Sequence, residues 1–190
     1  SGAARSARTP RPALNGAAHE ATPVPTHTMC ALRAAGKVGA DNMLTSDAFD
    51  DDASVVRIVL PEGVVGVADG SWNYEYGRGE GAFSGCLNLV EVVLPASCTS
   101  IGVEAFAGCS SLTTITLPTT LTSIGRAAFD GCSSLTTITL PDTLTSIGEC
   151  AFDGCSSLTT ITLPTTLTSI GVCTFDGCSS LQTLLVASPA

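Results

Sequence analysis

The chain has 190 residues, a net charge of −9 and a charge distribution that argues against nucleic-acid binding. Its first 45 residues contribute +3, so the remaining 145 residues carry −12. Nucleic-acid affinity depends on Lys and Arg side chains that neutralise phosphates, and an acidic region of this size is therefore not expected to bind DNA or RNA. Because no stretch of about 18 uninterrupted apolar residues occurs, we also predict no transmembrane segment. Any association with a membrane is expected to be peripheral and to depend on partner proteins.

Residues 1–27 are rich in Pro, Ala and Arg and are predicted to form an extended arm. The first 19 residues contain no acid, which is typical of an organelle transit peptide. This interpretation favours a plastid over a mitochondrion, and the alternative is an ordinary tail on a cell-surface or secreted protein. Residues 28–47 are expected to form an N-terminal cap, in which Thr28–Val38 make a short helix that covers the start of the following domain.

The third segment, residues 48–190, is a repeat array with a period of 23 residues. In five of its units a Phe is followed three residues later by a Cys. These pairs are Phe83 and Cys86, Phe106 and Cys109, Phe129 and Cys132, Phe152 and Cys155, and Phe175 and Cys178. A fixed period in the twenties indicates a solenoid, in which each coil gains a core only by stacking on its neighbours. The array is long enough for about five to six coils, more than the three or so that stability requires.

An aromatic insertion of 11 residues interrupts the array, because Pro61 and Pro95 are 34 residues apart rather than 23. It lies at about 62–82 and contains the only tryptophan and both tyrosines of the chain. Trp and Tyr are enriched at interface hot spots. The alternative is that these aromatics fold back over the first coils as a local cap. We predict that a partner protein contacts the insertion and the arm through Trp72, Tyr74, Tyr76, Arg5, Arg8 and Arg11.

One strand is predicted in each unit. In the segment 112–117, alternation directs Ile115 and Leu117 to the core and the intervening threonines outward. We expect the strand to stack in parallel on its equivalents and to end at the following proline. Gly125 then permits a turn into a short helical or 3₁₀ segment. The outward threonines form a candidate exposed face, which is interpreted as a solvated sheet or, alternatively, as an ice-binding array: Thr114, Thr116, Thr137, Thr139, Thr160 and Thr162.

The pattern L-x-x-I-x-L-P, followed by I-G-x-x-A-F-x-G-C-x-x-L, resembles the 23-residue repeat of the BspA-like leucine-rich-repeat family over about residues 48–186. The first unit departs from it, since Asp52 replaces the cysteine. The resemblance implies a right-handed leucine-rich-repeat solenoid with a parallel strand and a short helical or 3₁₀ turn in each coil. It also implies a surface role in binding extracellular proteins or other cells.

Cysteines and acids in the repeats are interpreted as structural. The nine cysteines are expected to be mostly free, buried thiols, because equivalent side chains of adjacent coils point the same way, which suits a disulfide poorly. Asp130, Asp153 and Asp176 each precede a glycine and are interpreted as turn residues, with cation binding as the alternative.

No enzyme activity, cofactor or metal site is predicted. The repeats contain no Lys or His, and the only histidines, His19 and His27, lie in the arm. We therefore expect a non-enzymatic protein–protein interaction module, acting as a scaffold or linker subunit of a multi-subunit assembly. Cell-surface adhesion is the alternative. No polar cap follows the last predicted strand, 184–186, which favours a partner at this edge.

Overall fold

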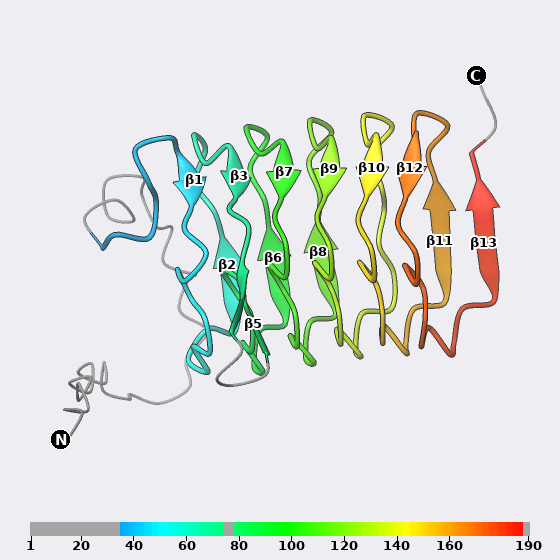
Figure 1. Ribbon diagram of the computed structural model, residues 1–190, viewed down its shortest axis with the longest axis horizontal. Coiled ribbons are helices and arrows are strands. Elements are labelled where there is room, and N and C mark those ends of the chain that lie inside the picture. Colours follow the sequence, from blue (N-terminus) through cyan, green and yellow to red (C-terminus); the bar gives the residue numbers. More distant parts are fainter. Residues whose placement is uncertain (1–34, 74–77, 188–190) are drawn as a thin grey trace, which may run out of the picture.

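A computed structural model describes residues 35–73 and 78–187, and in it the chain forms a parallel β-solenoid of about six coils (Figure 1). Each coil contributes one short strand to a six-stranded sheet with the order β1-β3-β7-β9-β10-β12. These strands are β1 (Met43–Leu44), β3 (Gly66–Val67), β7 (Ser100–Ile101), β9 (Ser123–Ile124), β10 (Ser146–Ile147) and β12 (Ser169–Ile170). We number the coils 1 to 6 by these strands. The predicted solenoid is therefore confirmed.

A second row of strands carries the L-x-x-I-x-L motif. Its first sheet contains β2 (Arg57–Val59), β6 (Glu91–Val93) and β8 (Thr114–Thr116), and its second contains β11 (Thr160–Leu163) and β13 (Thr183–Val186). Coil 4 has only an isolated bridge, Thr137 to Thr160, at this position. The predicted parallel stacking of this strand on its equivalents is therefore interrupted at coil 4. A pocket of about 340 Å³ lies between coils 3 and 4 at this break. Elsewhere these two coils stay in register, because Phe106 N donates to Ala128 O at 2.8 Å.

A column of phenylalanine rings forms the centre of the core. Neighbouring rings from Phe49 to Phe175 are stacked with centroids 4.9–5.7 Å apart and interplanar angles of 3–6°. Phe129 and Phe152 are completely buried, as the repeat register predicts. Because a single coil cannot enclose such a ring, the column stabilises the fold only through contacts between coils.

The repeat cysteines form a second column beside the rings. Each thiol donates a hydrogen bond of 2.9–3.2 Å to the Phe carbonyl of the preceding coil. At one end of the column Cys86 donates to Phe49, and at the other end Cys178 donates to Phe152. Eight cysteines are free thiols in the described part of the chain. The prediction that they are buried is wrong for Cys150 and Cys178, which are half-buried, and for Cys173, which is exposed.

The predicted helical or 3₁₀ segment is a series of turns in the described coils. Asp130 N donates to Ala127 O and Cys132 N to Phe129 O, which are single-turn bonds. Ala127 (φ 51°) and Gly131 (φ 69°) have left-handed backbone angles, and a right-handed helix cannot continue through them.

The first coil is closed by residues that precede it. Val38 forms an antiparallel bridge with Leu44, and the Lys37 ammonium lies 3.6 Å from the Phe49 ring centroid. Of the predicted helix Thr28–Val38, only residues 35–38 are described, and these form a turn and the bridge. At the other end the apolar residues Ile170, Leu184 and Val186 are 46%, 47% and 68% exposed.

Candidate binding surfaces

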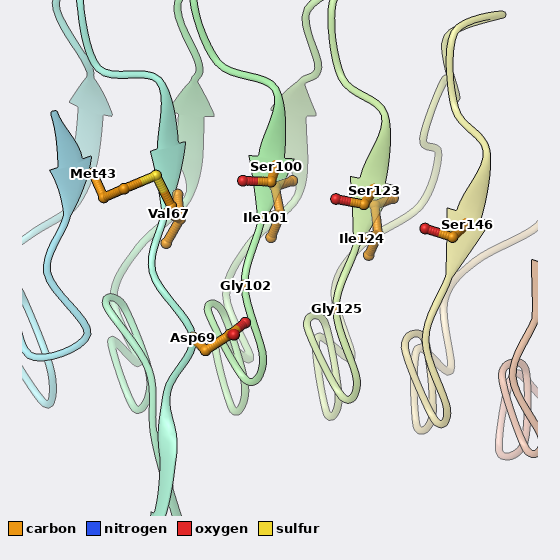
Figure 2. A pocket seen from close by; sticks show the side chains of 10 residues that line it. All are labelled: Met43, Val67, Asp69, Ser100, Ile101, Gly102, Ser123, Ile124, Gly125 and Ser146. Atoms are coloured by element: carbon orange, nitrogen blue, oxygen red, sulfur yellow. The ribbon is translucent and has the colours of Figure 1, made fainter. Parts of the chain in front are cut away.

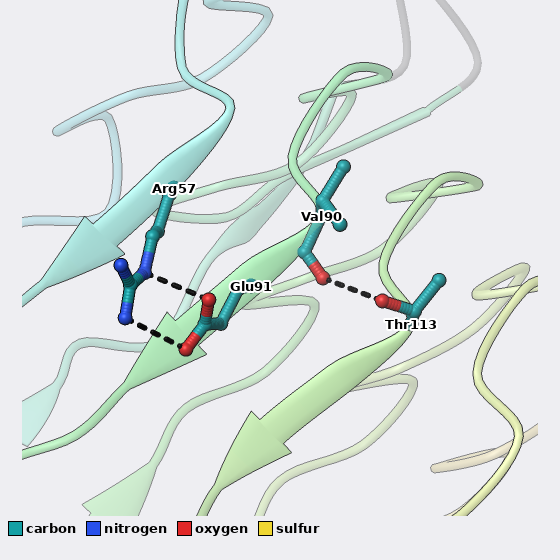
Figure 3. A network of polar contacts seen from close by, with 4 residues as sticks. All are labelled: Arg57, Val90, Glu91 and Thr113. Carbon is teal, nitrogen blue, oxygen red and sulfur yellow. Dashed lines mark hydrogen bonds and ion pairs between the residues drawn. The ribbon is translucent and has the colours of Figure 1, made fainter. Parts of the chain in front are cut away.

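The outward face of the second strand row changes character along the solenoid. In coils 3 to 6 most of its outward positions are threonines. In coils 1 and 2 the same positions hold Arg57, Val59, Glu91 and Val93. Figure 3 shows the Arg57 guanidinium facing the Glu91 carboxylate, with Nε 2.7 Å and Nη2 3.1 Å from its oxygens. An exposed ion pair of this kind contributes little stability, but it makes these coils chemically distinct.

Three exposed apolar side chains lie in the same two coils as this ion pair. Val56, Leu87 and Val90 are 54%, 56% and 39% exposed, and we call them the apolar patch. Val90 N donates to Val56 O at 2.7 Å, so the patch spans coils 1 and 2. In coils 3 to 5 the positions of Leu87 and Val90 are polar: Ser110, Ser133, Ser156, Thr113, Thr136 and Thr159. Figure 3 shows one of them, Thr113, whose hydroxyl donates to Val90 O at 3.1 Å.

The apolar patch was missed by the sequence analysis. The detectable signal is that Leu87 and Val90 depart from the Ser and Thr that hold the same positions in later units. An exposed apolar cluster with a polar border is typical of a protein-binding site.

A shallow groove of about 350 Å³ runs along the six-stranded sheet. Figure 2 shows the hydroxyls of Ser100, Ser123 and Ser146 in a row, all pointing the same way, with Met43 at one end. Gly66 takes the place of a serine in coil 2, where an added Cβ would lie 2.8 Å from the Met43 sulfur. The row offers hydrogen-bonding hydroxyl groups, and the carboxylate of Asp69, which accepts a 2.9 Å bond from Val103 N, lines the same groove.

The aromatic insertion contains a short hairpin. Strands β4 (Ser71–Asn73) and β5 (Arg78–Glu80) are antiparallel, and Gly70 N donates to Val103 O at 2.8 Å where the hairpin begins. Trp72 lies on β4, opposite Gly79. The remaining predicted contact residues lie outside the described part of the chain: Tyr74, Tyr76, Arg5, Arg8 and Arg11. Partner binding by this set therefore stays a prediction.

The backbone of a buried glutamate, Glu104, lies close to a residue that flanks the hairpin. Glu104 is 2% exposed, and its Oε1 accepts a 2.8 Å bond from Arg126, while Oε2 has no hydrogen-bond partner. Burial raises the pKa of Glu104, and Arg126 opposes this shift. A Cβ on Gly81, which directly follows β5, would lie 2.0 Å from Glu104 O. Only a glycine therefore fits where the insertion rejoins the coil.

Within the described residues, no group of three or more His, Cys, Asp or Glu side chains is arranged to hold a metal ion. The same residues include no helix that is long and apolar enough to span a membrane.

Asp130→Asn is expected to stabilise the protein at pH 7. Partial desolvation and the charge of Asp153 raise the pKa of Asp130. An acid with a raised folded-state pKa stabilises the fold below its unfolded pKa of about 4, and that contribution is lost as the pH rises through the folded value. Asp130 is exposed, so the gain should not exceed about 0.5 kcal/mol.

Urea unfolding at two pH values checks this expectation. The gain should disappear near pH 3, where both states bind the proton. Asp142→Asn is the control, since Asp142 is exposed but does not occupy the repeat position of Asp130, Asp153 and Asp176. A variant that is less stable than the parent at pH 7 would show that Asp130 makes a favourable contact as an anion.

Comparison with known families identifies the repeats. Six copies of the BspA-type leucine-rich repeat match residues 78–189, which is more than half of the chain. The chain belongs to this family. The predicted resemblance is thereby confirmed, and the family match includes the candidate threonine face and the cysteine column. A comparison with curated protein sequences gives no significant match.

Solved structures of bacterial leucine-rich-repeat proteins share the fold. A leucine-rich-repeat protein from T. pallidum is 35% identical, with a TM-score of 0.64 over 75% of this chain and 62% of that one. A leucine-rich cell-surface protein from Faecalibacterium prausnitzii is 30% identical, with a TM-score of 0.62 over 70% of this chain and 32% of that one. A leucine-rich-repeat protein from Bacteroides ovatus is 29% identical, with a TM-score of 0.56 over 75% and 39%. The chain thus spans less than two thirds of the length of each.

Proposed function

We propose that this leucine-rich-repeat protein binds other proteins, as a scaffold or linker subunit of a larger assembly. The apolar patch is the observation that carries the proposal. Val56, Leu87 and Val90 keep large side chains in water, at repeat positions where coils 3 to 5 have Ser or Thr, since Val56 and Val90 share one position. Burying these side chains against a partner removes apolar surface from water, which is the main driving force of association.

Replacing Leu87 by Ser and Val90 by Thr is expected to weaken partner binding roughly thirtyfold or more. Both substitutions introduce residues that coils 3 to 5 already have at these positions, so the fold should be retained. Loss of an interface anchor typically costs about 2 kcal/mol, which is roughly a thirtyfold loss of affinity. The measurement is cross-linked capture from native extract, followed by titration of the captured partner.

The control for this experiment substitutes the equivalent face of another coil. Ser133→Ala/Thr136→Ala changes the same two positions in coil 4 and should leave capture unchanged. Circular dichroism and thermal unfolding confirm that both variants are folded. Equal partner capture by the Leu87→Ser/Val90→Thr variant and the parent would remove the patch from the binding surface.

A second contact is proposed for the aromatic insertion and the arm. Trp72→Ala/Tyr74→Ala should weaken association about thirtyfold if these side chains are hot-spot anchors. Deletion of residues 1–27 removes Arg5, Arg8 and Arg11, and should weaken binding in a salt-sensitive way if the partner is acidic. Equal recovery of the same partners by both variants would leave the insertion as a local cap on the first coils.

Cell-surface adhesion is the second candidate function. It is favoured by the structural similarity to a protein described as a leucine-rich cell-surface protein. In this case the ligand would be an extracellular protein, and purified chain would bind intact cells until their surface proteins are removed by protease. Binding that survives protease treatment would contradict this candidate.

A further inference from the structure

Two cysteines occupy the same position in coils 5 and 6. Cys150 N donates to Val172 O at 3.0 Å, and β10 pairs in parallel with β12 just before them, so Cys150 and Cys173 are in register. Both have left-handed backbone angles, φ 53° and φ 55°. Residues in register with the same backbone conformation direct their Cα–Cβ bonds in parallel, and the two side chains therefore lie side by side.

These two thiols differ from the cysteine column in exposure and bonding. Cys150 is half-buried and Cys173 is exposed, and within the described residues neither thiol makes a hydrogen bond. The column thiols instead donate to Phe carbonyls, and burial raises the pKa of Cys86 and Cys155 to about 12. A ligand from solvent therefore meets Cys150 and Cys173 before the buried thiols of the column, Cys86, Cys109, Cys132 and Cys155.

The spacing of the coils suits a bridging ion better than a disulfide. Ring centroids of Phe152 and Phe175, in the same two coils, are 5.7 Å apart. A disulfide requires sulfur atoms about 2.05 Å apart, so both parallel side chains would have to turn toward each other. Zinc–thiolate bonds are about 2.3 Å long, and two metal–sulfur bonds of similar length in a linear bridge place the sulfurs about 4.6 Å apart. This separation is much closer to the spacing of these coils than that in a disulfide.

Acidic side chains make a positive ligand favourable at this place. Desolvation, the neighbouring Cys173, and the carboxylates of Asp153, Glu149 and Asp130 raise the pKa of Cys150. A bound cation would offset this unfavourable charge on the thiolate. The lack of any three-ligand group in the described residues argues against tetrahedral Zn²⁺, which takes four ligands.

We propose that Cys150 and Cys173 form a two-coordinate site for a soft monovalent metal ion of the Cu(I) class. Thiolates are the ligands that select Cu(I) over harder ions. On binding, each S–H bond releases its proton to solvent and one sulfur–metal bond forms in its place. Nothing is oxidised or reduced, and the two thiolates and one Cu(I) leave a net charge of −1.

The test is an anaerobic titration of the full chain with Cu(I) against a colorimetric chelator. The parent and Cys30→Ser should each retain one Cu(I) per chain, and X-ray absorption of the parent should show two sulfur neighbours. Cys150→Ala and Cys173→Ala should each lose this tight binding. Alanine suits the position, because Ala127 already holds it in coil 4 with φ 51°.

Three results would overturn the proposal. The first is tight Cu(I) binding by the double variant Cys150→Ala/Cys173→Ala that equals binding by the parent. The second is three or four sulfur neighbours around the metal, which would place it elsewhere. The third is a Cys150–Cys173 disulfide in protein purified without oxygen, detected by peptide mapping under non-reducing conditions. The absorption measurement uses the unmodified chain and remains decisive if a variant does not fold.

Discussion

Phe152→Ala is expected to lower the free energy of unfolding by about 3–5 kcal/mol. The ring is completely buried and stacks on Phe129 at 5.2 Å and on Phe175 at 5.7 Å. Its removal leaves a cavity in the middle of the ring column and ends two stacking contacts, each worth about 0.5–1.5 kcal/mol. Because coils are stable only through their neighbours, coils 5 and 6 should also lose protection from amide hydrogen exchange.

The matched control is Phe175→Ala, one coil further along. Phe175 is only partly buried and stacks on a single ring, so the same chemical change should cost clearly less. Urea unfolding of the parent and both variants gives the comparison. Equal losses for Phe152→Ala and Phe175→Ala would show that the ring column is not the main source of stability.

Periodic residues made the fold predictable. The register of Phe and Cys specified which side chains are buried, because every coil repeats the same contacts: Cys98 takes the place of Leu121, and both are completely buried. The Asp-Gly turns were predictable for the same reason, since Gly131, Gly154 and Gly177 all have positive φ.

The errors occur where identical local sequences meet different surroundings. Thr137–Thr139 have nearly the sequence of β8 and β11, yet they form only one bridge, and strand pairing depends on the neighbouring coil as well as on alternation. Cys150 and Cys173 were grouped with the buried cysteines by residue type, although their position in the unit is occupied by Ala127 and Glu104 in other coils. The apolar patch does not follow from the repeat pattern, because Leu87 and Val90 depart from the Ser and Thr that later units have at the same positions.

The candidate surfaces divide the solenoid by position. The apolar patch and its ion pair belong to coils 1 and 2, whereas the accessible thiol pair belongs to coils 5 and 6. In a repeat array each coil contacts only its neighbours, so substitutions at one end should not alter binding at the other. Partner capture and Cu(I) binding can therefore be tested independently in the same protein.

Gly148→Ala is expected to cost about 3 kcal/mol or more, because it forces two coils apart. An added Cβ would lie 2.4 Å from Arg126 N and 2.5 Å from Gly125 C, which are backbone atoms that cannot rotate away. The sequence analysis explained glycines at this position by turn conformation. Gly148 has no positive φ, and the physical requirement is close approach of successive coils.

Gly154→Ala separates the two explanations. Gly154 has a φ of 66°, but the nearest atom to its added Cβ is 3.4 Å away, so only left-handed strain of about 1–2 kcal/mol is expected. Urea unfolding should therefore rank Gly148→Ala as the more damaging variant, although its backbone conformation is open to any residue. A Gly148→Ala variant that loses no more unfolding free energy than Gly154→Ala would show that the coils can move apart here at little cost. Close backbone packing would then not be the reason for a glycine after the isoleucine that recurs in the units, such as Ile147.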